Sequence, residues 1–298
     1  MTQYQKIRTK PKQFKALCSI TVEQFDILLP IFEGKWLDFI ERYTLDGQPR
    51  VRKYTPKNEE QLPTVADKLF FILYYDKNNP LQESLAAFFD LEVSMSNKWV
   101  HILTPILKKA LAKYTPCRRV ETLEINPQEE HIVDGSERPI QRDTYVEGDF
   151  YSGKKGTHTV KNVLLITSIG VILWLGATCA GKLHDKTLVE HLTFQNSFTL
   201  LADLGFLGWQ PNDVNLVLPH KKPRNTKTQK RDLTPEQKEF NKGLAKRRVK
   251  VENVLAHVKI LRIVKDRNRN YKLNFRDDIM VIACAIHNFR LKNAINCI

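Results

Sequence analysis

The amino-acid sequence predicts an α/β protein in which a mixed sheet flanked by helices follows an all-α N-terminal region. Residues 1 to about 120 carry helical apolar patterns and capping signals, whereas short β-branched runs begin at His131. Strands that come first in pairs and then alternate with helical segments indicate a mixed sheet with helices packed on it. We therefore expect a helical domain over 1–120 and a sheet domain over 129–293.

Two N-terminal segments carry clear helix-start signals. Thr21, with Gln24 three residues later, forms a capping box, and Thr64 directly precedes the strongly apolar run VADKLFFILYYDK. Both patterns predict a helix that begins immediately after the threonine.

A helix-turn-helix pattern lies at about 81–111. Leu81–Phe89 has the pattern of a short amphipathic helix, and Ser94 is placed to cap a longer helix that buries Trp99 and Ile102. In such a motif the exposed first residues of the second helix face base edges and phosphates. Here these DNA-recognition residues are expected to be Ser96, Asn97, Lys98 and His101. A plain helical hairpin would show a similar pattern, so this segment alone leaves both interpretations open.

Nearly all of the excess positive charge lies in one segment. The chain has 47 Lys and Arg against 33 Asp and Glu, a net charge of +14, and residues 221–272 alone have 18 against 5, a net +13. A basic tract of this kind suits a polyanion such as nucleic acid, because neutralising phosphates releases counterions. A solvated surface that keeps the protein soluble is the alternative.

The cysteines and one uncharged stretch bear on the cell compartment. The five cysteines are scattered and form no C-x-x-C pair, which is typical of reduced cytoplasmic thiols, and the N-terminus lacks the apolar region of a secretion signal. Val163–Gly181 has no charge, but residues 168–170 divide it into two β-branched runs. We therefore expect a buried antiparallel hairpin over 157–179 rather than a membrane span.

Two carboxylates end predicted buried strands. Asp134 ends the run IVD and is followed by Gly135, and Asp203 ends the run TLLAD, with Gly205 two residues later. The C-terminal ends of buried strands are where an α/β sheet presents reactive groups, and a glycine there allows close approach. Two such carboxylates are placed to share divalent ions.

Three other aspartates compete for these roles. Asp143 and Asp149 end no predicted buried strand. Asp185 lies at the start of a predicted helix, His184–Phe194, where an acidic residue near the N-cap is ordinary. We therefore favour the two strand-end carboxylates.

A third carboxylate comes from a predicted helix, Lys246–Ile263. Its buried side is expected to consist of Val249, Val251, Val254, Leu255, Val258 and Leu261. Arg248, Glu252 and Lys259 lie along an adjacent stripe, and by itself Glu252 is explained by an ion pair with Arg248. Together with the two aspartates, Glu252 completes the hard oxygen ligands that two Mg²⁺ ions, or Mn²⁺, prefer. Two such ions support an in-line displacement at phosphorus, in which Arg248 and Lys259 would hold phosphates or stabilise developing charge.

Several short motifs, in order along the chain, resemble those of DDE transposases of bacterial insertion sequences. They are DGSERPIQRD from Asp134, YSGKKGTHTVKN from Tyr151, ADLGFLG around Asp203, PHKKPR from Pro219 and R-x-x-x-E-x-x-x-x-x-x-K from Arg248. The similar branch is the one related to the eukaryotic Harbinger elements, and the resemblance runs from about Pro80 to Phe289.

The resemblance implies a ribonuclease H-like catalytic domain with Asp134, Asp203 and Glu252 as its metal-binding triad. The spacing is also similar to the family's, with 68 residues between the two aspartates and 48 between Asp203 and Glu252. Tyr151 and Lys154 would contact the DNA backbone. The implied partners are terminal inverted repeats and target DNA, bound by at least a homodimer, and the implied location is the bacterial cytoplasm, with the nucleoid.

Two other functions also fit the motifs. One is a transposase-derived protein that binds terminal repeats without cutting, and the other is a structure-selective nuclease that cuts without joining. A tyrosine recombinase does not, because no tyrosine follows Tyr271 to act after the His287 and Arg290 pair. The sequence has no G-x-x-x-x-G-K-[ST] loop, so no nucleotide cofactor is expected. Trp174 and Trp209 suit stacking on an extruded base, but aromatic residues within or beside strands usually belong to the core.

Overall fold

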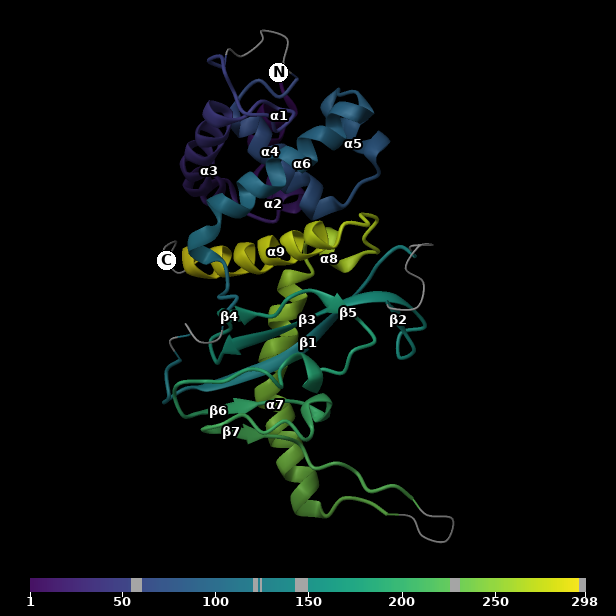
Figure 1. Cartoon of the computed structure of the whole chain (residues 1–298). Coiled ribbons are helices and arrows are strands. Elements are labelled where there is room, and N and C mark those ends of the chain that lie inside the picture. The colour runs from purple at the N-terminus through teal and green to yellow at the C-terminus, as the bar shows by residue number, and fades with distance from the viewer. Residues whose placement is uncertain (55–60, 120–122, 124, 143–149, 226–230, 295–298) are drawn as a thin grey trace. The chain divides into compact units, whose positions relative to one another are not determined.

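The computed structural model describes residues 1–54, 61–119, 123, 125–142, 150–225 and 231–294 (Figure 1). The chain divides into two compact units. A helical unit is formed by Met1–Thr115 together with Val258–Ile298, and a sheet unit is formed by Pro116–His257. The C-terminal helices thus group with the N-terminal ones, although the sequence assigned them to the sheet domain.

Among the residues that the structure describes, six α-helices make up the N-terminal part of the helical unit. They are α1 (Gln3–Arg8), α2 (Pro11–Cys18), α3 (Val22–Arg42), α4 (Val65–Asn78), α5 (Gln82–Phe89) and α6 (Val93–Ala110). The predicted capping signals are confirmed, because Thr21 and Gln24 form a capping box at the start of α3 and Thr64 caps α4. The predicted cap at Ser94 is wrong, since α6 begins one residue earlier, with Glu92 as its N-cap.

The C-terminal helices complete the helical unit. A 3-10 helix, η1 (Ala112–Tyr114), follows α6, and α8 (Arg262–Lys265) and α9 (Leu273–Ala294) follow the sheet unit along the chain. α9 packs against α6 and η1, α8 packs against α4, and Lys108 of α6 forms an ion pair with Asp278 of α9. This packing explains why residues after 258 group with the N-terminal helices.

The sheet unit contains a mixed sheet, as the sequence predicts. Its strands are β1 (Glu130–Pro139), β2 (Tyr151–Ser152), β3 (Thr157–Thr167), β4 (Ile172–Leu175), β5 (Cys179–Ala180), β6 (Phe198–Leu201) and β7 (Val214–Val217). The strand order is β2-β3-β1-β6-β7, with β4 and β5 also paired to β3. β3 runs antiparallel to β1 and β4, whereas β1, β6 and β7 are parallel. The predicted hairpin is therefore confirmed as β3 and β4.

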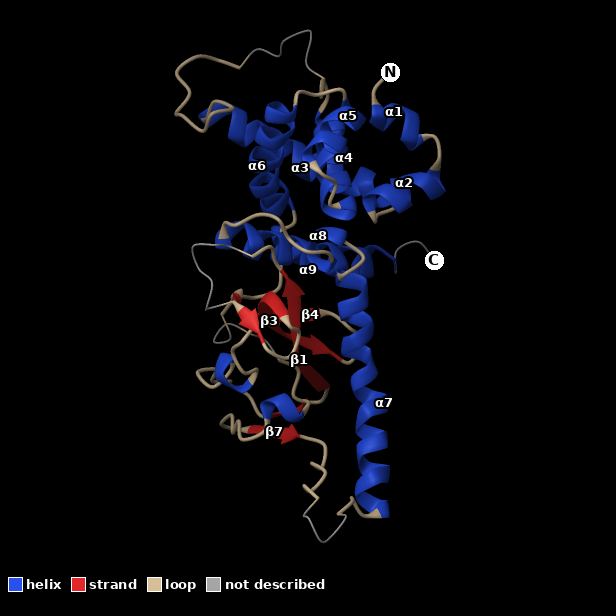
Figure 2. Cartoon of the chain, turned by 90° about the vertical axis from the view of Figure 1, so that its right-hand side faces the viewer, coloured by secondary structure: helices blue, strands red, loops and turns tan. Residues whose placement is uncertain are grey.

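One long helix, α7 (Pro235–Val258), lies along one face of the sheet, as Figure 1 and Figure 2 show together. Buried residues of the strands and of the connections between them form the core of this unit. Trp174 and Trp209 belong to that core, each with 4% of its surface exposed, which confirms the structural interpretation of both. In the part of the chain that the structure describes, no helix has the length and hydrophobicity of a transmembrane span.

The predicted helix His184–Phe194 is wrong. The structure has only a short 3-10 turn there, η3 (Lys186–Leu188). Val189, Leu192 and Phe194 all join the core of the sheet unit, and their spacing does not form one helical face. Tertiary burial therefore overrides the local helical preference of this segment.

The predicted helix Lys246–Ile263 has both ends misplaced. α7 begins at Pro235, where Thr234 and Gln237 form reciprocal side-chain to backbone hydrogen bonds, and it ends at Val258. The expected burial of Val249 is also wrong, because 44% of its surface is exposed. A threonine N-cap followed by a proline at the first helical position is a start signal that the sequence carried.

Candidate active site

Asp134 and Asp203 lie side by side because two parallel strands pair in register. His131 of β1 is paired with Leu200 of β6, and the next pair is Ile132 with Leu201. Two further residues along each segment lead to Asp134, which is still on β1, and to Asp203, which lies two residues past the end of β6. Paired strands are about 4.8 Å apart, so the two aspartates lie near each other. The expectation that Asp134 ends its strand is wrong, because β1 continues to Pro139 beside β3. Only its parallel pairing with β6 ends before Asp134.

A backbone amide from a nearby glycine holds each carboxylate. The amide of Gly135 donates to Asp134 Oδ1 over 2.9 Å, and the amide of Gly205 donates to Asp203 Oδ1 over 2.8 Å. Asp203 is the N-cap of a short 3-10 helix, η4 (Leu204–Phe206), which turns the chain directly after the carboxylate. Each side chain is therefore held by a hydrogen bond from a glycine amide that follows it in the sequence.

Burial and neighbouring charges act on the Asp134 carboxyl. The pKa of Asp134 is raised to about 6, chiefly by burial, and the negative charges of Asp203 and Asp185 contribute to this increase. The hydrogen bond from Gly135 and the positive charge of Arg248 act in the opposite direction. These effects mean that Asp203, Asp185 and Arg248 all lie within electrostatic range of Asp134.

Asp185 lies closer to the strand ends than the sequence predicts. A Cβ atom added to Gly135 would lie 2.5 Å from Asp185 Oδ1, and one added to Gly205 would lie 2.8 Å from Asp185 Oδ2. The explanation of Asp185 as a helix cap is wrong, because its side chain makes no capping hydrogen bond to η3. Its Oδ1 instead lies 3.1 Å from Nζ of Lys161, a residue of β3 that sequence reasoning missed. The available signal was a lysine two residues before the apolar run Val163–Ile166 of a predicted strand.

Arg248 and Glu252 lie one turn apart on α7. Arg248 is partly buried, and its Nε has no hydrogen-bond partner among the described residues, whereas Glu252 is exposed. The described residues contain no group of three His, Cys, Asp or Glu side chains close enough together to hold a metal ion. The structure thus brings Asp134 and Asp203 together, and the convergence of Glu252 with them stays a prediction. Lys259 follows the end of α7, and its phosphate contact also stays a prediction.

The chain matches the model of one known protein family. The family model for DDE superfamily endonucleases matches residues 133–288, which is more than half of the chain. The chain belongs to the DDE superfamily endonucleases. The matched residues include all three carboxylates of the predicted triad, as well as Asp185 and Arg248.

A known transposase is similar over most of its length to this DDE superfamily endonuclease. The probable transposase for insertion sequence element IS702 of Microchaete diplosiphon is 28% identical over 233 residues, which cover 76% of this chain and 81% of that protein. No solved structure matches the chain. The family and this relative identify the chain as a nuclease or transposase that acts on DNA, and DDE endonuclease domains use divalent metal ions.

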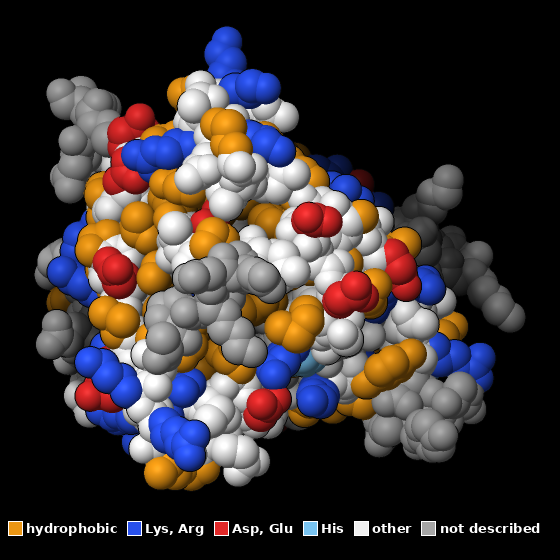
Figure 3. Space-filling view, turned by 90° about the horizontal axis from the view of Figure 1, so that it is seen from above, with side chains coloured by type: hydrophobic (Ala, Val, Ile, Leu, Met, Phe, Trp, Pro, Cys, Tyr) orange, Lys and Arg blue, Asp and Glu red, His pale blue; other side chains and the backbone are white. Residues whose placement is uncertain are grey.

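The four predicted DNA-recognition residues of α6 differ in exposure. Ser96 is fully buried, and its hydroxyl donates to Gln82 Oε1 of α5, so the expectation that it faces base edges is wrong. Asn97 is exposed, Lys98 forms an ion pair with Asp46 at 2.6 Å, and the exposed His101 contacts the Phe275 ring. On the face of the helical unit seen in Figure 3, basic, acidic and hydrophobic side chains are interspersed.

Tyr151 and Lys154 lie at one end of the sheet. Tyr151 of β2 pairs with His158 of β3, six residues before the partner of Asp134 on the same strand, Leu164. Six residues of strand span about 20 Å, so the structure does not bring Tyr151 to the aspartates. Lys154 is exposed in the turn that follows β2. Asp143 and Asp149, the alternatives to Asp134, lie outside the described residues.

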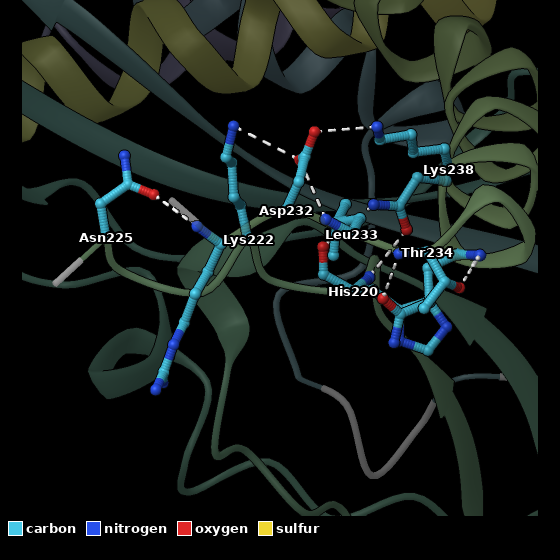
Figure 4. Close-up of polar contacts among 10 residues, drawn as sticks. His220, Lys222, Asn225, Asp232, Leu233, Thr234 and Lys238 are labelled. Atoms are coloured by element: carbon cyan, nitrogen blue, oxygen red, sulfur yellow. Dashed lines mark hydrogen bonds and ion pairs between the residues drawn. The ribbon is translucent and has the colours of Figure 1, made fainter. Parts of the chain in front are cut away.

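The basic segment before α7 is attached to the start of that helix (Figure 4). The backbone amide of His220 donates to Asn241 Oδ1 over 2.7 Å, and Asn241 Nδ2 donates back to the carbonyl oxygen of His220 over 2.9 Å. Asp232 lies between two lysines, 3.3 Å from Lys222 and 2.8 Å from Lys238. Along α7 the exposed lysines and arginines are Lys238, Lys242, Lys246, Arg247 and Lys250. This part of the basic tract therefore belongs to the sheet unit, with the two aspartates.

Proposed function

We propose that the chain is an insertion-sequence transposase that binds the terminal inverted repeats of its element, cuts DNA at the element ends and joins them to target DNA. The observation that carries the proposal is the parallel register of β1 and β6, which sets Asp134 beside Asp203. The family match and the similarity to the IS702 transposase support the same activity. A ribonuclease H-like sheet and the Harbinger-related branch are part of this proposal.

The residues around the two aspartates fit a divalent cation. The donors are carboxylate oxygens, which Mg²⁺ and Mn²⁺ prefer, and the lack of a side chain at Gly135 and Gly205 lets a further carboxylate, that of Asp185, pack beside them. We propose that Asp134, Asp203 and Glu252 hold two Mg²⁺ ions. When bound, such ions activate the attacking oxygen and stabilise the leaving one during phosphodiester cleavage.

The chain's own residues would bind and orient the DNA strand. Arg248 lies in electrostatic range of Asp134, so its guanidinium would attract a phosphate group bound near the aspartates. A guanidinium placed there also offsets the repulsion between the acidic side chains and the phosphate. We propose the same phosphate-holding role for Lys259.

Recognition of the element ends is proposed for α5 and α6. Asn97, Lys98 and His101 lie on the second of these helices, so they would contact base edges and phosphates if α6 enters the major groove. Tyr151, Lys154 and the basic tract would contact the backbone away from the cleavage site. Because two element ends react together, we propose at least a homodimer on DNA, associated with the bacterial nucleoid.

One incubation separates this function from its alternatives. Labelled element-end DNA, a target plasmid and Mg²⁺ are mixed with the full chain, and the products are resolved by size. Joined products support transposition, cuts without joining support a nuclease, and shifted but intact DNA supports a binding protein.

The matched variants are Asp134→Asn and Asp213→Asn. The first should abolish cutting while leaving DNA binding intact. Asp213 is exposed just before β7, at the opposite end of the strands from Asp203, so its variant should cut like the wild type. Equal cutting by both variants would contradict the assignment of Asp134.

A further inference from the structure

Asp185 is a carboxylate outside the predicted triad that lies against Gly135 and Gly205, the glycines that follow the two aspartates. Its two oxygens lie over Gly135 and Gly205, at 2.5 Å and 2.8 Å from the positions where Cβ atoms would be. These are the same glycines whose amides hold Asp134 and Asp203. Any larger residue at either glycine would displace Asp185, so the two glycines and this carboxylate form one packed arrangement.

Lys161 fixes Asp185 in that place. Its Nζ lies 3.1 Å from Asp185 Oδ1 and donates to the carbonyl oxygen of Leu183 over 2.8 Å. Only 11% of the Lys161 side chain and 21% of the Asp185 side chain are exposed, so solvent screens this ion pair little. The lysine thus ties the segment that carries Asp185 to the middle of the sheet.

The charges around the aspartate pair do not cancel. Asp134, Asp203 and Asp185 contribute three negative charges when ionised, and Arg248 and Lys161 contribute two positive ones. Without a cation, these five side chains therefore have a net negative charge. Each acidic side chain raises the affinity of the site for a cation, and each basic side chain lowers it. Asp185 favours a bound cation, whereas Lys161 opposes it.

We propose that Asp185 is a positioning residue of the cation site, which strengthens divalent-cation binding by Asp134 and Asp203, and that Lys161 sets the strength of this effect. The inference rests on the proposed function, since it takes these two aspartates as the cation ligands. It adds a fourth carboxylate to the centre and gives Lys161 a role in tuning it.

The proposal predicts opposite changes for two neighbouring variants. Asp185→Asn keeps the size of the side chain but removes its charge, so Mn²⁺ affinity should fall about 10-fold, as for other residues that support metal ligands. Lys161→Gln removes the opposing charge while keeping a donor for the Leu183 carbonyl, so Mn²⁺ affinity should rise. A purely structural role would make both variants less stable and change their affinities in the same direction.

The test is calorimetric titration of MnCl₂ into the full chain without DNA at pH 7.5. Melting temperatures in chelator check that each variant is folded. Weaker binding by Asp185→Asn together with tighter binding by Lys161→Gln supports the proposal. An Asp185→Asn affinity within about twofold of wild type, or a fall in both variants, overturns it.

Asp134→Asn distinguishes this inference from the proposed function. If Asp134→Asn weakens Mn²⁺ binding and Asp185→Asn does not, only the role of Asp185 is wrong. If the wild type does not bind Mn²⁺ at all, both the cation site and the role of Asp185 are wrong. Should Asp185→Asn fail to fold, the direction of the change in Lys161→Gln alone decides the outcome.

Discussion

Neutralising Asp134 should make the protein more stable at alkaline pH, although we expect it to abolish cleavage. The folded-state pKa of about 6 exceeds the ordinary value of 3.8, so the folded chain binds this proton more tightly than the unfolded chain does. The ionised carboxylate therefore destabilises the fold above pH 6, and the penalty shrinks as the pH falls from 6 towards 3.8. The difference between the two pKa values corresponds to at most about 3 kcal/mol, because the side chain is partly exposed.

Asp134→Asn removes this penalty and keeps the local hydrogen bond, since an amide oxygen can still accept from Gly135. We expect a gain in unfolding free energy that approaches about 3 kcal/mol at pH 8 and about half of that at pH 5. Urea unfolding in chelator measures it through tryptophan fluorescence, to which Trp174 and Trp209 in the sheet core contribute. A loss of stability at pH 8, or an equal gain at both pH values, would refute the reasoning.

Three further variants test other parts of the structure. Gly205→Ala would place a methyl group 2.8 Å from Asp185 Oδ2, so it should cost about 1–3 kcal/mol in urea unfolding. Gly153→Ala, whose Cβ meets nothing within 4 Å, is its control, and equal stabilities would contradict the predicted crowding. Thr64→Ala removes the N-cap of α4 and should cost about 1 kcal/mol by the same measurement, with no change counting against the cap. Glu252→Gln should unfold like the wild type, because Glu252 is exposed, yet lose cutting of labelled DNA; retained cutting would exclude Glu252 from the triad.

Local signals predicted the starts of α3 and α4 and the hairpin because their causes are local. A threonine with a glutamine three residues later satisfies orphan amides within one turn, so Thr21 was sufficient to place the start of α3. The β-branched runs on either side of residues 168–170 similarly predicted β3 and β4. Neither inference needed knowledge of a distant partner.

Predictions that depend on contacts between residues far apart in the sequence were less accurate. Ser96 looked exposed from its position in α6, but Gln82 of α5 accepts its hydroxyl hydrogen bond and the two helices bury it. The sequence of 184–194 predicted a helix, but the structure has turns there, because the apolar residues of the segment pack into the core. In this arrangement Asp185 lies beside Lys161. Such long-range contacts have no signature in the local spacing of residues.

The candidate site was predicted only in part from local patterns. The strand-like runs and their following glycines identified Asp134 and Asp203, but only the pairing of β1 with β6 establishes that they are neighbours. Glu252 was identified from its stripe on a helix and from family resemblance, and a stripe alone does not fix where a helix face points. The role of Asp185 required the positions of both glycines and of Lys161.

The central claim is that Asp134, Asp203 and Glu252 serve one divalent-cation site. Fe²⁺ bound in place of Mg²⁺ generates radicals that cut the nearby polypeptide backbone, and fragment masses give the positions of the cuts. The account predicts cuts near residues 134, 203 and 252, all suppressed by excess Mg²⁺. Cuts confined to other segments, or cuts near 134 and 203 without any near 252, would contradict the proposed triad.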